Sequence, residues 1–306
     1  MSVSSVGACR HRWRWAGAWV AALCLTSPTA IGADEPVPFV DAHVHLNDEA
    51  MQIELMRRFG ATQAVVFWGR NSDNAAVAAA ARRHPELFIP FVSISPERAA
   101  YRQAWQRDDP ALLEQLDQLL ASGAYRGIGE ISAVHFPSPG FPEADYSPLG
   151  ATMLGIMALA RKHRVPVLLH VESSRLHELE RLLERHPEVA VIWAHGGYTP
   201  LFIARRLLER HSNLHYELSA RTWARHPRSP DYTILRDGRA VWPEWLALIE
   251  ALPDRFLVGT DASHRSLDSE IEKAESVQSF LRQLTPATRD RVARLNILAL
   301  VGAAAR

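Results

Sequence analysis

The amino-acid sequence predicts an α/β protein of the (β/α)8 barrel class, also called a TIM barrel, in a single domain. From residue 37 onwards, short apolar runs of β-forming residues alternate with amphipathic stretches of helical period. The joins are short, as right-handed crossovers in one parallel sheet require. A chain of 306 residues with 47% hydrophobic residues can hold one such barrel, which takes about 250 residues. A doubly wound open sheet is the alternative, but no GxGxxG segment follows the first run.

The pattern predicts eight strands, each followed by a helix, and one further helix at the end. The strands are expected at residues 39–45, 63–67, 88–94, 127–131, 165–171, 189–194, 214–219 and 256–261. The helices are expected at residues 48–59, 73–83, 110–121, 148–163, 175–185, 200–210, 243–251, 268–284 and 286–301.

Four histidines stand where helices are expected to end. Each follows a basic residue, and two of them precede a proline. Cations favour the negative C-terminal end of a helix dipole, and proline prevents the helix from continuing. We therefore interpret these four as helix-end residues and not as metal ligands: His84, His163, His186 and His211.

Two long segments follow the expected fourth and seventh strands. Residues 132–147 are rich in proline and glycine, and residues 220–242 are rich in arginine, proline and aromatic residues. Loops that follow barrel strands lie on the C-terminal face, where barrel enzymes build their active sites. We expect both segments either to cover a substrate or to be solvated loops.

The N-terminus has the pattern of a secretory signal peptide. Residues 1–14 contain three arginines and no acid, residues 16–25 are apolar, and small residues lead to Ala33. The apolar stretch is short for a membrane span. We expect cleavage after Ala33 and an exported, periplasmic domain at residues 34–306, with no membrane attachment once the signal is removed. A retained anchor is the alternative.

Composition narrows the chemistry of the mature domain. Both cysteines, Cys9 and Cys24, lie in the expected signal peptide, so thiolate metal sites and disulfides are not expected. Removing residues 1–33 subtracts three arginines and no acid from 34 basic and 34 acidic residues, which leaves a net charge of about −3. A slightly acidic domain is not expected to bind nucleic acid.

Polar side chains interrupt the apolar runs at the C-terminal ends of five expected strands. His43 and His45 end the first strand, and because side chains alternate along a strand, both project from one face. The C-terminal ends of barrel strands meet at one face, where a buried charged or imidazole group is costly unless it is paired or ligated. Six residues therefore predict a metal site: His43, His45, Glu130, His170, His195 and Asp261.

Nitrogen and carboxylate ligands without sulfur suit Zn²⁺, and Mn²⁺ or another transition metal is an alternative. A bound divalent ion lowers the pKa of its water and polarises a substrate oxygen. Asp261 is expected to hold the metal and to accept the proton of that water as general base. His195 is expected either to bind a second ion or to hydrogen-bond the nucleophile or the polarised oxygen.

These motifs resemble the metal-dependent amidohydrolase superfamily over residues 38–302. Residues 41–45 (DAHVH), His170, the segment 195–197 (HGG) and the segment 259–261 (GTD) look like its signatures on strands one, five, six and eight. The stretch 242–261 is similar to the amidohydrolase-related, or amidohydrolase-2, branch. The resemblance implies metal ligation by the two histidines of DAHVH, His170 and Asp261, general-base catalysis by Asp261, and assistance from His195.

Glu130 resembles the strand-four glutamate that bridges two metals in TatD-like members. Other branches use a carboxylated lysine there, but neither Lys162 nor Lys273 is at an expected strand end. The sequence leaves open whether the site holds one ion or two, with two favoured.

Candidate substrate-binding residues follow the same strands. Arginines suit a carboxylate or phosphate, whereas His135 and Glu172 suit a supporting or substrate contact. Tyr216, Glu217 and Ser219 either line the pocket floor or fill the barrel. The candidates for substrate binding are Arg70, His135, Glu172, Arg221, Trp223 and His264.

The sequence thus predicts a metal-dependent hydrolase that attacks an ester, lactone, amide or phosphoester of a small molecule. The first alternative keeps the site but changes the reaction to non-oxidative decarboxylation of an aromatic or unsaturated acid. The second is a non-enzymatic metal-binding barrel, and a TatD-like nuclease is disfavoured by charge and export. The sequence does not determine the oligomeric state, and a homo-oligomer is compatible with it.

Overall fold

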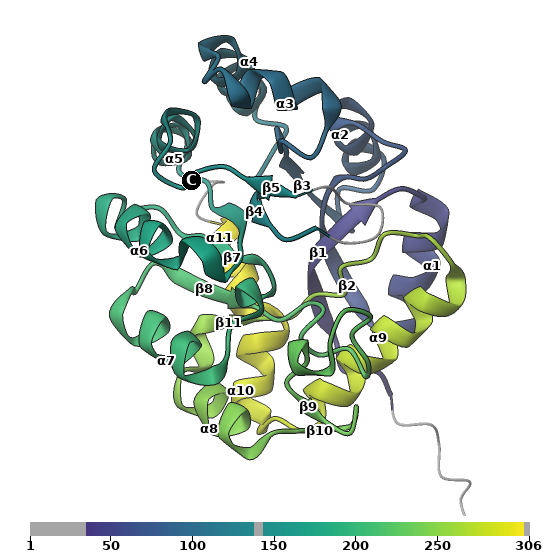
Figure 1. Ribbon diagram of the computed structural model, residues 1–306. Coiled ribbons are helices and arrows are strands. Elements are labelled where there is room, and N and C mark those ends of the chain that lie inside the picture. Colours follow the sequence, from purple (N-terminus) through teal and green to yellow (C-terminus); the bar gives the residue numbers. More distant parts are fainter. Residues whose placement is uncertain (1–34, 138–142, 303–306) are drawn as a thin grey trace, which may run out of the picture. The chain divides into compact units, whose positions relative to one another are not determined.

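The computed structural model describes residues 35–137 and 143–302, so the expected signal peptide lies outside the described residues. A compact unit begins at Pro36. In it, eight parallel strands form a nearly closed barrel in the order β1-β2-β3-β4-β6-β7-β8-β11, and helices alternate with the strands around it (Figure 1). The predicted (β/α)8 barrel class is confirmed.

The barrel strands range from two to nine residues in length. They are β1 (Phe39–Leu46), β2 (Ala61–Trp68), β3 (Phe88–Val92), β4 (Gly127–His135), β6 (Val167–Val171), β7 (Val191–Trp193), β8 (Leu214–Glu217) and β11 (Phe256–Leu257). The helices are α1 (Glu49–Phe59), α2 (Asn74–Arg83), α3 (Ala99–Gln106), α4 (Pro110–Ala121), α5 (Ala151–His163), α6 (Leu176–Arg185), α7 (Leu201–Arg210), α8 (Pro243–Ala251), α9 (Leu267–Leu281), α10 (Pro286–Asp290) and α11 (Asn296–Gly302).

Helix α3 is the main element that the sequence pattern does not predict. Only Trp105 of this helix is buried, and Arg98 at its N-cap makes no side-chain capping bond. Neither an apolar stripe nor a capping residue therefore marks it. A single π turn at Arg291–Leu295 also divides the expected last helix into α10 and α11.

Residues with specific capping chemistry define the helix ends. Asp48 accepts a hydrogen bond from the backbone N–H of Met51 at the start of α1. The same helix ends at Gly60, whose φ of 77° lies in the left-handed region that favours glycine. The histidines interpreted as helix-end residues are the C-caps of α2, α6 and α7 and the last residue of α5, as expected: His84, His186, His211 and His163.

The seam between the first and last strands depends on a buried carboxylate. The backbone of β1 meets the segment after β11 through Ala42 N to Val258 O at 3.0 Å. Asp41, 2% exposed, accepts hydrogen bonds from the N–H of Thr260 at 2.9 Å, from its hydroxyl at 2.6 Å and from the N–H of His43 at 3.1 Å. This carboxylate joins the two ends of the barrel directly below the ends of its strands.

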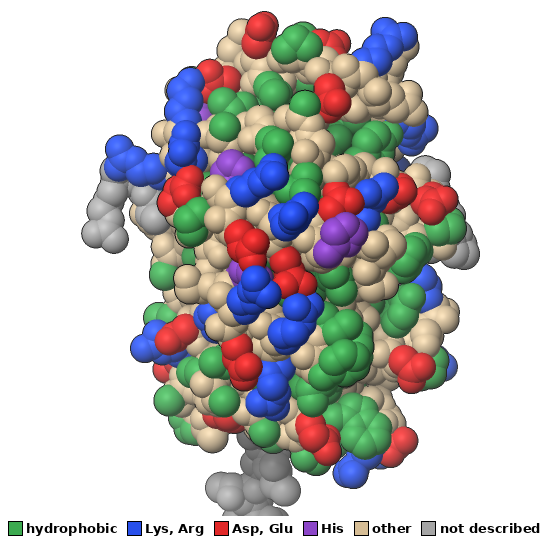
Figure 2. Space-filling view, turned by 60° about the vertical axis from the view of Figure 1, so that its left-hand side comes forward, with side chains coloured by type: hydrophobic (Ala, Val, Ile, Leu, Met, Phe, Trp, Pro, Cys, Tyr) green, Lys and Arg blue, Asp and Glu red, His purple; other side chains and the backbone are tan. Residues whose placement is uncertain are grey.

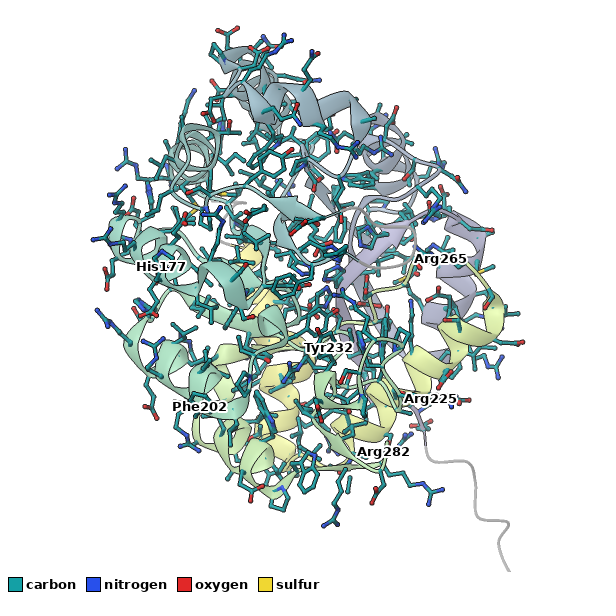
Figure 3. All side chains as sticks on the ribbon, viewed as in Figure 1. His177, Phe202, Arg225, Tyr232, Arg265 and Arg282 are labelled. Carbon is teal, nitrogen blue, oxygen red and sulfur yellow. The ribbon has the colours of Figure 1, made fainter. Side chains whose placement is uncertain are left out.

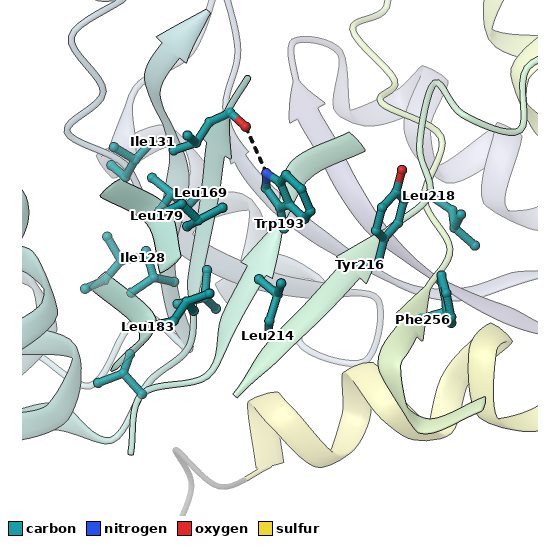
Figure 4. Packing of buried hydrophobic residues seen from close by; sticks show 14 of the residues in the cluster. Ile128, Ile131, Leu169, Leu179, Leu183, Trp193, Leu214, Tyr216, Leu218 and Phe256 are labelled. Carbon is teal, nitrogen blue, oxygen red and sulfur yellow. Dashed lines mark hydrogen bonds between the residues drawn. The ribbon is translucent and has the colours of Figure 1, made fainter. Parts of the chain in front are cut away.

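Large side chains pack between the sheet and the outer helices. Trp193 of β7 and Tyr216 of β8 stand side by side with ring centroids 5.7 Å apart, and Trp193 Nε1 donates to Val171 O at 2.9 Å (Figure 4). Leu179 and Leu183 of α6 belong to the same buried cluster. This packing fixes the positions of β6, β7 and β8 relative to one another. It thereby also fixes the residues at the C-terminal ends of these strands.

The two long segments carry short pieces of sheet. After β4, β5 (Ala144–Asp145) pairs antiparallel with the end of that strand, and residues 138–142 lie outside the described residues. After β8, β9 (Leu235–Arg236) and β10 (Ala240–Val241) pair with each other.

The surface carries charges of both signs. On the face in Figure 2, acidic and basic side chains are interspersed and no block of one sign dominates. Ion pairs join α6 to α7, with Arg206 at 2.6 Å from Glu180 and Arg210 at 2.7 Å from Glu184. Within the part of the chain described, no helix combines the length and apolarity needed to cross a membrane.

Candidate metal centre

The structure brings the six expected ligands together at the C-terminal ends of the strands. Two come from β1, one from β4 and one from β6, one from the 3-10 segment η2 (Ala194–Tyr198) after β7, and one from the segment after β11. In that order they are His43, His45, Glu130, His170, His195 and Asp261.

Two carboxylates lie close to the same pair of imidazole nitrogens. Glu130 Oε2 lies 3.5 Å from His43 Nε2 and 3.3 Å from His45 Nε2. Asp261 Oδ1 lies 3.6 Å and 3.4 Å from the same two nitrogens. Ligands bonded at 2.0–2.1 Å to a tetrahedral ion are separated by about 3.3–3.4 Å. The separations therefore match atoms that share an ion.

Backbone carbonyls orient two of the imidazoles. His45 Nδ1 lies 3.2 Å from Trp68 O, and His195 Nδ1 lies 3.0 Å from Ser219 O. A carbonyl oxygen only accepts hydrogen bonds, so both Nδ1 atoms carry the proton. In the neutral ring Nε2 then keeps its lone pair, and in both residues Nε2 faces the carboxylates.

His43 provides the clearest test of whether the site suits an ion. Its ring is completely buried, and Nδ1 lies 3.1 Å from the equally buried Glu217 carboxylate. Its Nε2 has no hydrogen-bond partner among the described residues. A buried polar atom without a partner is costly, and a ligated imidazole commonly donates its other N–H to a carboxylate. The His43–Glu217 pair therefore fits a metal ligand.

The second oxygen of Glu130 faces a different pair of histidines. Oε1 lies 3.0 Å from His170 Nδ1 and 3.8 Å from His195 Nε2. His170 Nε2 lies 3.1 Å from the carboxylate of Glu172. The two oxygens of Glu130 thus divide the cluster into two sets of ligands that can each hold an ion.

Neighbouring carboxylates keep three of the imidazoles basic. Burial lowers the pKa of His45, but Asp261 and Glu130 outweigh it and raise that pKa to about 9. Burial likewise lowers the pKa of His170, which Glu130 and Glu172 raise to about 9. The pKa of His43 is also raised well above its usual value, against its burial, by Glu130 and Glu217. An ion must displace these protons near neutral pH.

Asp261 and His195 differ from that group. Burial raises the pKa of Asp261, but the hydrogen bond from His45 and the charge of His43 hold it well below its usual range. Burial lowers the pKa of His195 to about 4, although the charge of Asp261 opposes this. At neutral pH, Asp261 is therefore a carboxylate and His195 a neutral lone-pair donor.

Two glycines leave room for the ligands. Gly196 has a φ of 52°, and a Cβ there would lie 1.8 Å from the ring of Tyr216. A Cβ on Gly259 would lie 2.7 Å from Glu217 Oε1 and 2.9 Å from His43 Cβ. A larger residue at Gly259 would displace His43 or the Glu217 carboxylate that supports it, and one at Gly196 would collide with the ring of Tyr216 next to His195.

Two of the expected substrate-binding residues lie beside the centre. Glu172 is 1% exposed and contacts His170, and its Oε1 lies 3.3 Å from Arg228 Nη1. His135 is buried, with Nε2 3.2 Å from Arg228 Nη2 and its ring centroid 5.1 Å from that of His170.

The other four expected substrate-binding residues make contacts away from the ligands or are exposed. Arg70 is exposed at the end of β2. His264 bonds to Asn47 N at 3.2 Å and to Gln52 Oε1 at 2.9 Å.

The remaining two of these candidates, one buried and one partly exposed, lie at the start of the loop after β8. Arg221 is 2% exposed, donates to Thr199 O at 2.9 Å and packs on Trp245. Trp223 donates to Thr260 O at 3.1 Å. For Arg221 these contacts support the fold, and its binding of substrate stays a prediction.

Sequence analysis missed a group of aromatic and charged residues next to the cluster. Tyr198 stacks on His195 at 5.2 Å and on Tyr232 at 4.5 Å, and the guanidinium of Arg228 lies 5.2 Å from the ring of Tyr198. Figure 3 shows Tyr232 towards the middle of the barrel, well inside the rim. Their only sequence signal is that they follow strand ends.

Glu97, in the loop after β3, was also missed. Burial and the charge of Glu130 raise its pKa to about 6. His45 and His170 act on the same carboxyl electrostatically, so it lies in the field of the centre.

Two further His/Glu groupings are better explained as support for the ligands. One consists of His43, His195 and Glu217, and the other of His135, His170 and Glu172. Glu217 and Glu172 each hydrogen-bond the outward nitrogen of an expected ligand. Arg228 already neutralises Glu172, which opposes a cation there.

Comparison with known families identifies the kind of protein. A family model described as amidohydrolase matches residues 40–303. The chain belongs to the amidohydrolase family, in the amidohydrolase-2 branch. This confirms the family resemblance expected from the sequence. No curated protein sequence matches this amidohydrolase.

Solved structures share its fold. A TIM-barrel protein from Bordetella bronchiseptica is 16% identical with a TM-score of 0.62, covering 88% of this chain and 100% of its own. 2,6-Dihydroxybenzoate decarboxylase from Rhizobium is 15% identical with a TM-score of 0.56, covering 87% and 98%. An amidohydrolase from Burkholderia multivorans with bound zinc is 15% identical with a TM-score of 0.53, covering 87% and 99%. Such low identities support the fold alone.

Proposed function

We propose that this amidohydrolase is a metal-dependent hydrolase that uses an activated water to cleave an ester, lactone, amide or phosphoester. The observation that carries the proposal is the position of Glu130. One carboxylate oxygen faces His43 and His45, which Asp261 also contacts, and the other faces His170 and His195. One carboxylate with ligands on both sides suits a bridged pair of ions.

Zn²⁺ is the proposed ion, because the donors are imidazole nitrogens and carboxylate oxygens. Mn²⁺ is the alternative. A bound divalent ion supplies a water of lowered pKa and polarises the substrate oxygen. The ligands proposed for it are His43, His45, Glu130, His170, His195 and Asp261.

The protein's own residues supply the remaining chemistry. Asp261 stays ionised at neutral pH because His45 and His43 hold its pKa low, so it can accept the proton of the attacking water. His195 is neutral with its lone pair directed inward, so it acts as a ligand or hydrogen-bond acceptor. The hydroxyl of Tyr198 stays protonated because burial raises its pKa well above the usual value. It can therefore donate to a substrate oxygen.

One observation favours a second function, the decarboxylation of an organic acid. Arg228 is 20% exposed beside His170 and Glu172, and its two contacts engage two of the five N–H donors of a guanidinium. A guanidinium suits a planar carboxylate. In this alternative a single ion suffices, and Asp261 would first take up a proton from water and then pass it to the ring carbon as the bond from that carbon to the carboxylate breaks and carbon dioxide leaves.

Metal content and product analysis separate the two functions. Metal per chain is measured for wild type and Glu130→Gln, and the zinc-loaded proteins are tested on aryl esters, lactones and phosphoesters and for carbon dioxide release from aromatic acids. The proposal is supported if wild type binds two ions per chain, Glu130→Gln binds one or none, and wild type hydrolyses a substrate that Asp261→Asn does not. One ion unaffected by Glu130→Gln, with carbon dioxide release, supports the decarboxylase. Absence of metal and of both activities contradicts both.

We also propose export to the periplasm after removal of residues 1–33, and a small molecule as the partner of the site. The N-terminal mass of the protein recovered from a periplasmic fraction tests the first point, and an uncleaved N-terminus contradicts it. Light scattering of the same preparation measures whether the domain forms homo-oligomers.

A further inference from the structure

Lys273 differs from every other basic residue near the centre. The chain contains 34 basic residues, of which only Lys162 and Lys273 are lysines. Lys162 is 59% exposed and pairs with Asp117 at the surface. The Lys273 side chain, on α9, is only 11% exposed. A lysine in a chain that otherwise uses arginine, buried next to a candidate ligand, requires a structural reason.

The ammonium of Lys273 makes three contacts. It donates to the backbone carbonyl of Asp261 at 2.7 Å, pairs with Glu270 Oε2 at 3.2 Å and lies 4.9 Å from the ring centre of Trp223. A compact ammonium with three donors can reach one carbonyl, one carboxylate and one aromatic face from a single nitrogen atom. The Nζ atom of Lys273 thus contacts residues of two loops, Asp261 after β11 and Trp223 after β8.

The first of these loops carries the proposed ligand and base. Asp261 has a φ of 53°, in the left-handed region that non-glycine residues rarely occupy. Such a conformation persists only where surrounding contacts hold it. On one side the N–H of His45 donates to Ala262 O at 2.9 Å, and on the other Lys273 holds the carbonyl of Asp261.

The second loop is the long segment 220–242 after β8. Trp223 Nε1 donates to Thr260 O at 3.1 Å, and Ala224 N donates to Ser276 Oγ of α9 at 3.1 Å. The start of this segment is therefore fixed both to α9 and to the residue before Asp261. Lys273 lies between the two attachments.

We propose that Lys273 is a positioning residue that holds Asp261 in its left-handed conformation and couples the metal centre to the segment 220–242. The proposal rests on the proposed role of Asp261 as a metal ligand. Losing the ammonium frees the Asp261 carbonyl and removes the cation under Trp223. The carboxylate then loses its fixed orientation, and the segment loses its link to it.

The test uses direct zinc binding, measured by competition with a chromophoric chelator. Lys273→Met leaves the buried Glu270 carboxylate unpaired and costs stability, so Lys273→Met/Glu270→Gln is made as well. Glu270→Gln alone and Lys162→Met are the controls. We expect about 10- to 100-fold weaker zinc binding in both Lys273 variants, as for other residues that support metal ligands. Lys162→Met, at an exposed ion pair, should stay within about twofold of wild type, and Glu270→Gln is the reference against which the double variant is compared.

Limited trypsin digestion tests the coupling. Arg225 is exposed in the segment 220–242 (Figure 3), so the bond after it reports on that segment. Zinc should slow this cleavage in wild type and in Glu270→Gln, and should protect less in the double variant even at saturation. The proposal is overturned if the double variant matches Glu270→Gln in zinc affinity and protection. If wild type binds no zinc, the proposed function itself fails, and the role of Lys273 fails with it.

Discussion

The two oxygens of Glu130 face surroundings that are built differently. Around Oε2, four separations between carboxylate oxygens and His43 or His45 nitrogens lie between 3.3 and 3.6 Å, close to the spacing of ligands around one ion. Around Oε1, His170 lies at hydrogen-bond distance, 3.0 Å, and His195 lies at 3.8 Å. We call these the Oε2 side and the Oε1 side.

From this difference we expect the two sides to differ in their affinity for a metal ion. On the Oε2 side the ligands already have the separations that an ion needs. On the Oε1 side, an ion must replace the hydrogen bond between His170 and Glu130 and draw His195 closer. Preorganised ligands bind more tightly because less free energy is spent on rearrangement. We expect the Oε2 side to fill first.

The largest effect is expected when one ligand of each side is removed. His43→Ala should weaken the tighter zinc site by more than about 100-fold, since a ligand contributes more than a supporting residue. His195→Ala should abolish only the weaker site. Zinc titration with a chelator of known affinity measures both, and His177→Ala, at a 76% exposed position, is the control. An equal loss of zinc affinity in His43→Ala and His195→Ala would contradict the expectation that the two sides bind zinc with unequal affinity.

The supporting carboxylates offer a matched pair of variants. Glu217 bonds His43 on the Oε2 side, and Glu172 bonds His170 on the Oε1 side, both at 3.1 Å. Glu217→Gln should weaken the first zinc site about 10- to 100-fold, and Glu172→Gln should weaken the second by a similar factor. Two-site calorimetric titrations distinguish them. The assignment of sides is wrong if both substitutions weaken the same site.

Proton release should also differ between the sides. On the Oε2 side, His43 and His45 both have raised pKa values and are therefore protonated at pH 7.5 in the zinc-free protein. On the Oε1 side only His170 has a raised pKa, and His195 is neutral. The first zinc ion should therefore release about two protons and the second about one. Titration calorimetry in two buffers of different ionisation enthalpy counts them. Equal release from both ions would contradict the comparison.

The same pKa values predict the pH dependence of stability. His45 and His170 have a folded pKa of about 9 against an ordinary value of 6.5. Their contribution to the stability of the zinc-free protein is fully present below pH 6.5 and is lost as the pH rises through 9, on the order of 1–3 kcal/mol each. The melting temperature without zinc should fall over this window, while the stabilisation by zinc should grow. A zinc-free melting temperature that rises instead would refute this.

The smallest effect concerns Arg228, which lies on the Oε1 side at 3.3 Å from Glu172. Removing a cation near a cation site strengthens ion binding, so Arg228→Gln should raise the affinity of the second zinc ion about two- to fivefold. The first site should not change. A loss of affinity would mean that Arg228 holds Glu172 in place for His170.

The convergence of the candidate ligands could be predicted because each is marked locally. His43, His170 and Asp261 each end a short apolar run, and the positions of strand ends on one face of a barrel follow from the fold class. The alternation of short runs and amphipathic helices also predicts the strand order. Helix α3 shows the limit, since one buried tryptophan and an arginine cap give no periodic signal.

The surroundings of the ligands could not be predicted in the same way. Arg228 and Tyr232 reach the centre through the path of a loop, which local periodicity does not encode. Arg221 illustrates the opposite case. It lies in the expected loop, yet it is buried against Trp245 and bonds to Thr199. Residue type and strand-end position identify candidate ligands, but the contacts of a loop decide which of its side chains reach them.

The seam at Asp41 has a consequence for the order of folding. Asp41 and Thr260 are separated by 219 residues along the chain, and three of the four candidate ligands of the Oε2 side, His43, His45 and Asp261, belong to the same two segments. Such long-range contacts form late, because closing a long loop costs entropy before it gains contacts. The Oε2 side is therefore complete only after the last strand has joined the first. A free ion at a concentration 100 times its dissociation constant would then stabilise the closed barrel by about 2.7 kcal/mol. It would do so by holding the first strand and the segment after the last strand together.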